Sequence, residues 1–157
     1  ASHSERDGDH RRRMAGRLSS LGTRGTRGLD PKIPQQMILE ARLLNELSDP
    51  ELIALFVNAV PHGHGVLGVE AAAWYWFGKP ADQLDPGEAA LLAGMVDAPS
   101  RYDPRRQPEL ASYHRARVLA AMVERGWLDP AEAKGLGGAP LPCGGPPWRS
   151  FPIEPPP

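Results

Sequence analysis

The chain has 157 residues, a length that fits one compact domain with a single core. Its 18 basic and 19 acidic residues give a net charge of -1, which argues against a general nucleic-acid binder, because binding to the phosphate backbone needs a surplus of positive charge. The single cysteine, Cys143, excludes an internal disulfide and a cysteine-based zinc site. No apolar run is long enough to span a bilayer and no signal peptide is visible, so we expect a soluble chain as it stands.

The 18 prolines and 17 glycines are concentrated toward the two ends of the chain. Residues 1–31 are polar and rich in arginine and glycine, with almost no apolar periodicity, which predicts a flexible arm. Residues 135–157 are rich in proline and glycine and predict an extended tail, in which Trp148 and Phe151 could pack onto the domain. The folded domain is therefore expected within residues 32–134.

The first predicted helix begins near Pro34, because proline is favoured in a first helical turn. Its apolar residues recur at spacings of three and four, at Met37, Ile38, Ala41, Leu44 and Leu47. Three further helix starts share one pattern, in which a capping Ser or Asp precedes a proline and then a Glu that can reach back to the cap. They lie at residues 48–51, 85–88 and 129–132.

A longer helix is expected between residues 107 and 125, ending at Gly126, a residue type that tolerates a left-handed cap. No segment alternates strictly enough to predict a sheet, although an isolated strand pair within residues 61–69 stays an open alternative. The sequence therefore predicts an all-α domain.

The least ordinary segment runs from Asn58 to Glu70 and contains three glycines within six residues. These glycines allow the backbone unusual conformations and could let a ligand approach closely; a loop that only reverses the chain is the simpler interpretation. His62 and His64 could share a metal, but two histidines without a third ligand are more often solvent-facing or helix-capping. Glu70 follows this loop and is either an acid-base candidate or a carboxylate at a helix start.

Two other segments leave alternatives open. The aromatic residues of segment 74–79 are suited to stacking on a sugar or lipid, or to packing against the core with Gly78 as the helix cap. Arginines surround the Pro-rich turn at residues 98–104, and their forked guanidinium groups suit a diphosphate or carboxylate, whereas a solvated helix face is the simpler interpretation. They are Arg101, Arg105, Arg106, Arg115 and Arg117.

The order of these segments resembles the glycosyltransferase family 51 peptidoglycan transglycosylases, the lysozyme-like domains of bifunctional penicillin-binding proteins and of monofunctional transglycosylases. The likeness covers residues 32–134 and depends on six segments in the family's order: Leu52 to Asn58, the Gly-His-Gly loop with Gly68 to Ala73, Phe77 to Lys79, Glu88 to Gly94, Ala98 to Pro104, and Arg115 to Met122. It implies an all-helical, lysozyme-like fold.

The resemblance implies a reaction in which lipid II units are joined into glycan strands at the outer face of the bacterial cytoplasmic membrane. In that family one Glu is the general base, and a second carboxylate, often with a divalent metal, supports the diphosphate; the residues themselves indicate no cofactor. The implied partners are lipid II or a glycan strand, with the membrane surface or cell-wall proteins as further candidates and no nucleic acid.

The chain departs from the family pattern in its first part. Residues 1–31 contain neither the Glu-Asp motif that carries the general base nor the Thr-Gln-Gln stretch that follows it. Alignment from Asn58 places Lys32 at the basic position and Gln36 where the second Glu would lie, and an amide cannot accept a proton or bind a metal with charge. No catalytic residue or metal ligand is therefore assigned, and we expect a divergent or truncated enzyme that does not polymerise lipid II by itself.

The substrate-binding residues carried over by resemblance are Lys32, Gln36, Asn58, Glu70 and Arg115. The main alternative function is a non-catalytic envelope module that binds glycan, anionic lipid or a cell-wall protein through the retained lobe and the Arg-rich arm. A helical adaptor with only a chance likeness is the third hypothesis.

Overall fold

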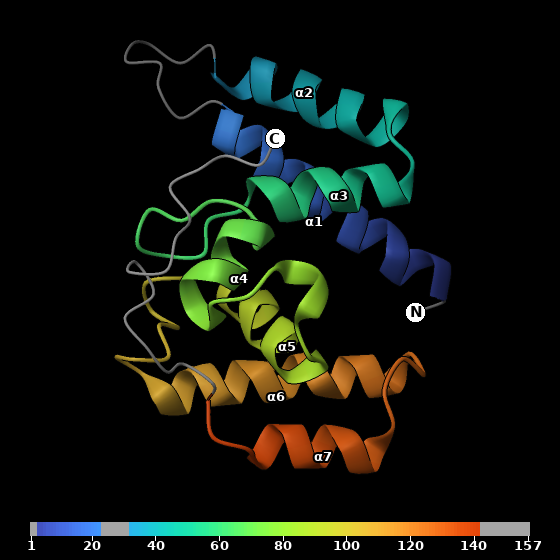
Figure 1. Ribbon diagram of the computed structural model, residues 1–157. Coiled ribbons are helices and arrows are strands. Elements are labelled where there is room, and N and C mark those ends of the chain that lie inside the picture. Colours follow the sequence, from blue (N-terminus) through green and yellow to red (C-terminus); the bar gives the residue numbers. More distant parts are fainter. Residues whose placement is uncertain (1–2, 23–31, 142–157) are drawn as a thin grey trace. The chain divides into compact units, whose positions relative to one another are not determined.

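The computed structural model describes residues 3–22 and 32–141, with the side chains of residues 8–20 and 38–141. This part of the chain is helical, and its only β-structure is an isolated bridge between Pro61 and Leu67, so the all-α prediction is confirmed. The helices, labelled in Figure 1, are α1 His3–Gly22, α2 Lys32–Glu46, α3 Asp49–Ala59, α4 Val69–Phe77, the 3-10 helix η1 Ala81–Gln83, α5 Pro86–Met95, α6 Pro108–Glu124 and α7 Pro130–Gly138. They form two compact units, Ala1–Val60 and Pro61–Pro157.

In the first unit, α1 packs against both α2 and α3. Arg11 of α1 joins the other two helices: its guanidinium donates to the carbonyl oxygens of Leu44 and Leu47 at 2.7 and 2.6 Å, and it forms an ion pair with Asp49 at the start of α3. The last carbonyl groups of a helix lack partners within the helix, so the arginine satisfies the C-terminal end of α2.

The structure corrects the expectation of a flexible arm, because residues 3–22 form α1. The apolar content of this helix is small, but Ala15, Leu18 and Ser19 are buried. Arg11 adds the contacts with α2 and α3, which the sequence pattern did not reveal. Burial of a few side chains and a satisfied arginine thus stabilise a helix that lacks a strong apolar stripe.

The predicted helix starts are confirmed. At α3, Glu51 accepts hydrogen bonds from the backbone N–H and hydroxyl of Ser48 at 2.8 and 2.6 Å. At α5, the Asp85 carboxylate accepts from the N–H of Glu88 at 2.8 Å, and the Glu88 carboxylate accepts from the N–H of Asp85 at 2.9 Å. Asp129 accepts from the N–H of Ala131 at 2.8 Å at the start of α7. Apart from the bond of the Ser48 hydroxyl, these bonds satisfy backbone N–H groups at helix starts, which lack partners within the helix.

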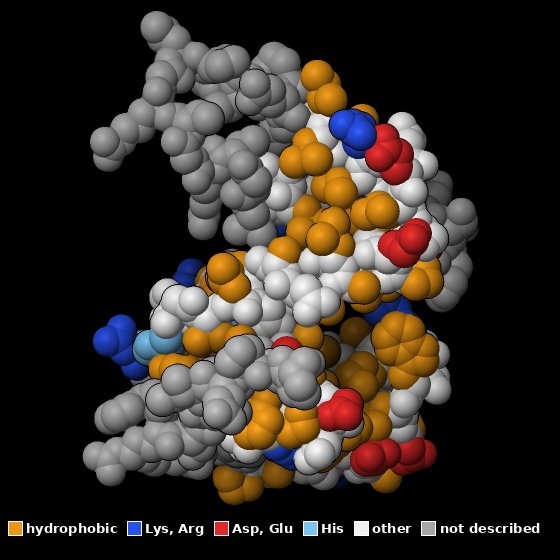
Figure 2. All heavy atoms as spheres, turned by 45° about the horizontal axis from the view of Figure 1, so that its top comes forward, with side chains coloured by type: hydrophobic (Ala, Val, Ile, Leu, Met, Phe, Trp, Pro, Cys, Tyr) orange, Lys and Arg blue, Asp and Glu red, His pale blue; other side chains and the backbone are white. Residues whose placement is uncertain are grey.

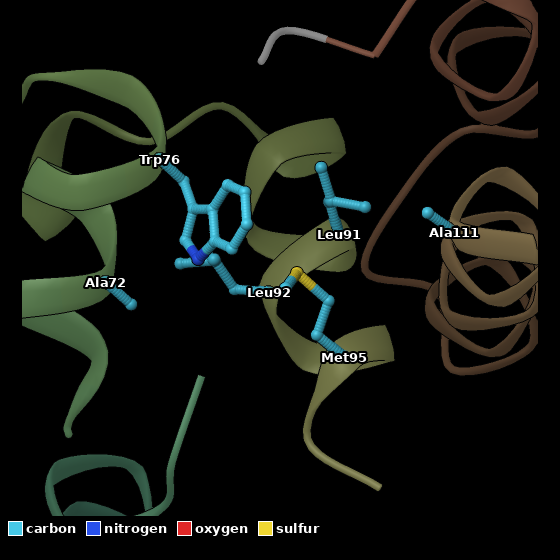
Figure 3. Packing of buried hydrophobic residues seen from close by; sticks show 6 residues of the cluster. All are labelled: Ala72, Trp76, Leu91, Leu92, Met95 and Ala111. Carbon is cyan, nitrogen blue, oxygen red and sulfur yellow. The ribbon is translucent and has the colours of Figure 1, made fainter. Parts of the chain in front are cut away.

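The core of the second unit lies between α4, α5 and α6. Figure 3 shows the indole of Trp76 from α4 directed toward the side chains of α5, with Ala111 of α6 beyond them. Its buried members are Ala72, Trp76, Leu91, Leu92, Met95 and Ala111. A large apolar side chain contributes roughly 1.5–3 kcal/mol when it is fully buried, so burial of this cluster stabilises the unit. For Trp76, the core interpretation of the aromatic segment is confirmed.

A second cluster connects α5, α6 and α7 around Ala90, Leu119 and Leu128, with Leu136 of α7 packed against it. The expected tail boundary at residue 135 is therefore corrected, because α7 continues to Gly138. Cys143, Trp148 and Phe151 lie outside the described residues.

Candidate functional site

The Gly-rich loop at residues 61–68 forms one wall of the candidate site. Gly63, His64 and Gly65 all have left-handed backbones, with φ values of 85°, 51° and 79°. Among the described residues other than glycine, only His64 has a positive φ. A left-handed backbone conformation costs a residue with a side chain roughly 1–2 kcal/mol. Gly63 also lies close to the Pro-rich turn, since a Cβ on it would be 3.6 Å from the carbonyl oxygen of Pro99.

The contacts of His64 hold its imidazole in place. Its Nε2 lies 3.0 Å from Oδ2 of Asp103, a residue 39 positions further along the chain. The imidazole also stacks on Tyr75, with ring centroids 5.5 Å apart, and meets the edge of Trp76 at 5.7 Å. The carboxylate and the two aromatic rings of α4 thus compensate the backbone strain and fix the direction of the side chain.

Asp103 is a buried carboxylate, only 2% exposed. Its Oδ1 accepts a hydrogen bond from the backbone N–H of Arg105 at 2.9 Å. Burial opposes ionisation, but this hydrogen bond, the contact with His64 and the backbone N–H of Arg106 outweigh it and hold the pKa of the Asp103 carboxyl below its usual value. The site therefore contains a fixed negative charge whose oxygens are engaged by the protein.

A pocket of about 280 Å³ opens at this contact, lined by His64, Ser100, Asp103 and Arg106. The turn that supplies three of these residues is built from backbone hydrogen bonds, among them Tyr102 N–H to the Ala98 carbonyl and Gln107 N–H to the Asp103 carbonyl. These backbone hydrogen bonds hold the turn in place, and Ser100 and Arg106 of this turn line the pocket.

A cationic side chain covers the aromatic wall beside the pocket. The guanidinium carbon of Arg105 lies 4.8 Å from the ring centroid of Trp76 and 5.3 Å from that of Tyr75. This cation–π contact covers aromatic rings for which the sequence left stacking on a sugar or lipid as one interpretation.

Three of the five substrate-binding residues expected by resemblance lie in the first unit. Lys32 and Gln36 are in α2, and their side chains lie outside the described residues. Asn58 is exposed near the end of α3, where its amide nitrogen donates to the carbonyl oxygen of Ala54 at 2.9 Å. The carbonyl oxygen of its side chain makes no hydrogen bond within the described part of the chain.

Glu70 and Arg115 lie in the second unit and contact different groups. The two oxygens of Glu70 accept from the indole N–H of Trp74 at 3.0 Å and from the backbone N–H of Ala81 at 2.9 Å, which joins α4 to η1. Arg115 is 2% exposed and donates to the carbonyl oxygens of Gly137 and Ala139 at 3.2 and 2.5 Å. Among the described side chains, no hydrogen bond or ion pair connects Glu70 with Arg115.

No described residue is assigned as a ligand of the divalent metal that the family resemblance implies. Such an ion is often held by one or two carboxylates together with phosphate oxygens of the substrate. Over residues 3–22 and 32–141, no group of three or more His, Cys, Asp or Glu side chains comes together. We therefore derive no chemical step through a metal.

The pair formed by His64 and Asp103 was missed by sequence reasoning. The sequence suggests for His64 either a metal shared with His62 or a solvent-facing or helix-capping position, and it places Asp103 only within a Pro-rich turn. The run of glycines around His64 was the available indication that its backbone is unusual. Nothing local in the sequence indicates that its partner lies 39 residues away.

Known proteins are similar to this chain over most of its length. The family model described as "Transglycosylase" covers residues 19–123. Penicillin-binding protein 1A of Aquifex aeolicus is 36% identical over 115 residues, which are 73% of this chain and 16% of that protein. Penicillin-binding protein 1C of Escherichia coli is 41% identical over 80 residues, 51% of this chain and 10% of that protein.

A solved structure agrees with the fold. The crystal structure of penicillin-binding protein 1A from Haemophilus influenzae aligns with a TM-score of 0.52 and 25% identity, over 83% of this chain and 16% of that chain. This likeness confirms the expected helical fold. The chain spans only about a sixth of the length of the penicillin-binding proteins 1A from Aquifex and Haemophilus that it matches.

Proposed function

The chain belongs to the transglycosylase family, and we propose from this membership that it takes part in joining lipid II units into peptidoglycan glycan strands. The observation that carries the proposal is the family match over residues 19–123, supported by identity above 30% with penicillin-binding proteins over most of the chain. The helical fold shared with a solved penicillin-binding protein is consistent with it.

Within that reaction, the proposed contribution of this chain is substrate binding rather than proton transfer. Positioned general bases commonly accelerate a reaction about 10²- to 10⁴-fold. The family's Glu-Asp motif is not found in residues 1–31, and Gln36 has an amide where the second carboxylate is expected. We therefore expect the isolated chain to bind lipid II or a glycan strand without polymerising it.

The proposed substrate contacts are Lys32, Gln36 and Asn58. Asn58 supports this role, because it is exposed and its side-chain carbonyl oxygen is available to accept a hydrogen bond from a sugar. Glu70 and Arg115 are proposed to hold neighbouring segments in place. The Glu70 carboxylate joins α4 to η1, and the buried Arg115 guanidinium joins α6 to the end of α7.

The proposed location is the bacterial cell envelope, at the outer face of the cytoplasmic membrane, where lipid-linked precursors are polymerised. No helix among the described residues is long and apolar enough to cross a membrane.

The experiment that tests the proposal measures binding and polymerisation separately. The chain is mixed with nanodiscs that contain lipid II, and nanodiscs without it are the control. We expect binding that depends on lipid II and no glycan product on a gel. Absence of lipid II-dependent binding would contradict the proposed function, and robust glycan synthesis would contradict the importance of the missing Glu-Asp motif.

A second candidate function follows from the apolar surface of the first unit. Ile38 of α2 is 61% exposed and Ile53 of α3 is 48% exposed. Leu39, which follows Ile38, and Leu55, two positions after Ile53, are also exposed. Figure 2 shows hydrophobic side chains gathered on the face that α2 and α3 present. We propose that this surface, together with the exposed arginines of α1, binds anionic lipid in a non-catalytic envelope module.

Vesicle sedimentation distinguishes this candidate from lipid II binding. A lipid-binding module would sediment with vesicles of phosphatidylglycerol that contain no lipid II, and the double change Ile38→Ser with Ile53→Ser would abolish the sedimentation. Sedimentation that is equal for the variant and the wild-type chain would contradict this candidate.

A further inference from the structure

The pocket beside His64 is not used by the proposed function. It lies within the second unit and is lined by His64, Ser100, Asp103 and Arg106, with a volume of about 280 Å³. We propose that this pocket binds a single oxyanion, a carboxylate or phosphate group carried by a small molecule. The proposal rests on the geometry of this pocket and stands whether or not the chain takes part in polymerisation.

Hydrogen-bond donors that the protein leaves unused line the pocket. In the part of the chain that the structure describes, neither the guanidinium of Arg106 nor the hydroxyl of Ser100 makes a hydrogen bond or ion pair. His64 uses Nε2 for Asp103, so the donors left for a ligand are those of Arg106 and Ser100. An arginine fork matches the two oxygens of a carboxylate or phosphate, and a hydroxyl adds a third donor.

The charges around the pocket favour an anion over a cation. Asp103 is the one acidic lining residue, but its oxygens already accept from the N–H of Arg105 and contact His64, and its side chain is almost completely buried. The guanidinium groups of Arg106 and Arg105 belong to the same turn and repel a cation. The positive charge of Arg106 therefore lines the pocket, whereas the negative charge of Asp103 is satisfied within the protein.

The imidazole wall of the pocket is also pre-organised. His64 is held by its left-handed backbone, by Asp103 and by stacking on Tyr75. A side chain that is already fixed loses little conformational freedom when a ligand binds. The volume of about 280 Å³ lies just below the usual range for ligand pockets, roughly 300–1,000 Å³, so the pocket fits an oxyanion with a few attached atoms rather than a long polymer.

An NMR titration of the full chain tests this site. The probes are inorganic phosphate, N-acetylmuramic acid, which carries a carboxylate, and N-acetylglucosamine as a neutral control, at constant ionic strength. We expect saturable shifts of the His64 and Ser100 resonances with phosphate, with N-acetylmuramic acid or with both, and no such shifts with the neutral sugar. Saturation by only one of the two anions would identify which oxyanion the pocket accepts.

A pair of arginine variants separates a built site from general attraction by positive charge. Arg106→Ala is expected to weaken binding about tenfold or more, the effect of losing a charged hydrogen-bond donor. Arg101→Ala removes an exposed arginine of the same turn that does not line the pocket, and the affinity is expected to stay within about twofold. Equal weakening by both changes, equal shifts with the neutral sugar, or no saturation with either anion would overturn the proposal. An unchanged amide spectrum outside the turn verifies that each variant is folded.

Discussion

Gly94 marks the closest approach of α5 and α6. A Cβ at this position would lie 3.1 Å from the backbone carbonyl carbon of His114, 3.2 Å from its Cβ and 3.3 Å from the backbone nitrogen of Arg115. Favourable contacts between carbon atoms are about 3.5–4.0 Å, and the atoms it would meet belong mostly to the backbone of α6, which cannot rotate away. Gly94→Ala is therefore expected to force the two helices apart.

Two opposing effects decide the size of the change. Alanine is favoured over glycine in a helix by about 0.8–1.0 kcal/mol, which would stabilise α5. Overpacking of a well-packed interface costs about 1–3 kcal/mol, and a clash with backbone lies toward the upper part of this range. The displacement would also disturb Leu91, Leu92 and Met95, which are buried along the same helix. We expect a net loss of about 1–2 kcal/mol in the free energy of unfolding.

Gly135→Ala is the matched control, because Gly135 is an exposed glycine within α7 and a Cβ there would meet no atom within 4 Å. This change is expected to raise the free energy of unfolding by up to about 1 kcal/mol. Urea denaturation followed by tryptophan fluorescence measures both variants, since Trp74 and Trp76 report on the second unit. A Gly94→Ala variant that is stabilised as much as Gly135→Ala would refute the close packing of α5 on α6.

Three further changes test separate features of the second unit. Asp85→Ala removes the cap that accepts from the N–H of Glu88 and should cost about 1 kcal/mol in the same urea assay; an unchanged midpoint would show that the cap contributes nothing. Leu92→Ala creates a cavity in the core and should cost about 2–5 kcal/mol, visible as a lower melting temperature in calorimetry, whereas a loss below this range would mean that the core relaxes around it. Asp103 has a lowered pKa in the folded state, so its ionised form stabilises the protein above about pH 4 and this stabilisation is lost as the pH falls further. Asp103→Asn keeps a polar group beside His64 and should lower the free energy of unfolding at pH 7. Between pH 5 and pH 2.5 this variant should lose less of its free energy of unfolding than the wild-type chain does. Parallel pH profiles of the two proteins would contradict this.

The helix starts could be predicted because the interactions that define them are local. Ser48, Asp85 and Asp129 each cap a helix through groups that lie two or three residues away. A pattern that satisfies unpaired N–H groups over so short a distance has the same effect in almost any tertiary context. The same holds for Gly78 and Gly126, which end their helices with φ values of 71°.

The helix α1 could not be predicted, because its stability depends on contacts with residues distant in sequence. Its arginines and glycines resemble a flexible segment, and intrinsic propensity alone does not make such a helix stable in water. Arg11 contacts the end of α2 and the start of α3, more than 30 residues further along the chain. These partners become visible only in the folded unit.

The candidate pocket illustrates the same limit for function. Resemblance to a family transfers expectations to single positions, and it pointed to Glu70 and Arg115, whose polar groups bond to the backbone of neighbouring segments. The contact between His64 and Asp103 joins a loop to a turn 39 residues later, so no local pattern encodes it. The sequence does indicate the backbone strain at this position. The glycines on both sides of His64 allow a left-handed backbone, a conformation that is strained for the histidine itself. Strain of this kind persists only where tertiary contacts compensate it, and an anion that engages Arg106 at the same pocket would add one more such contact.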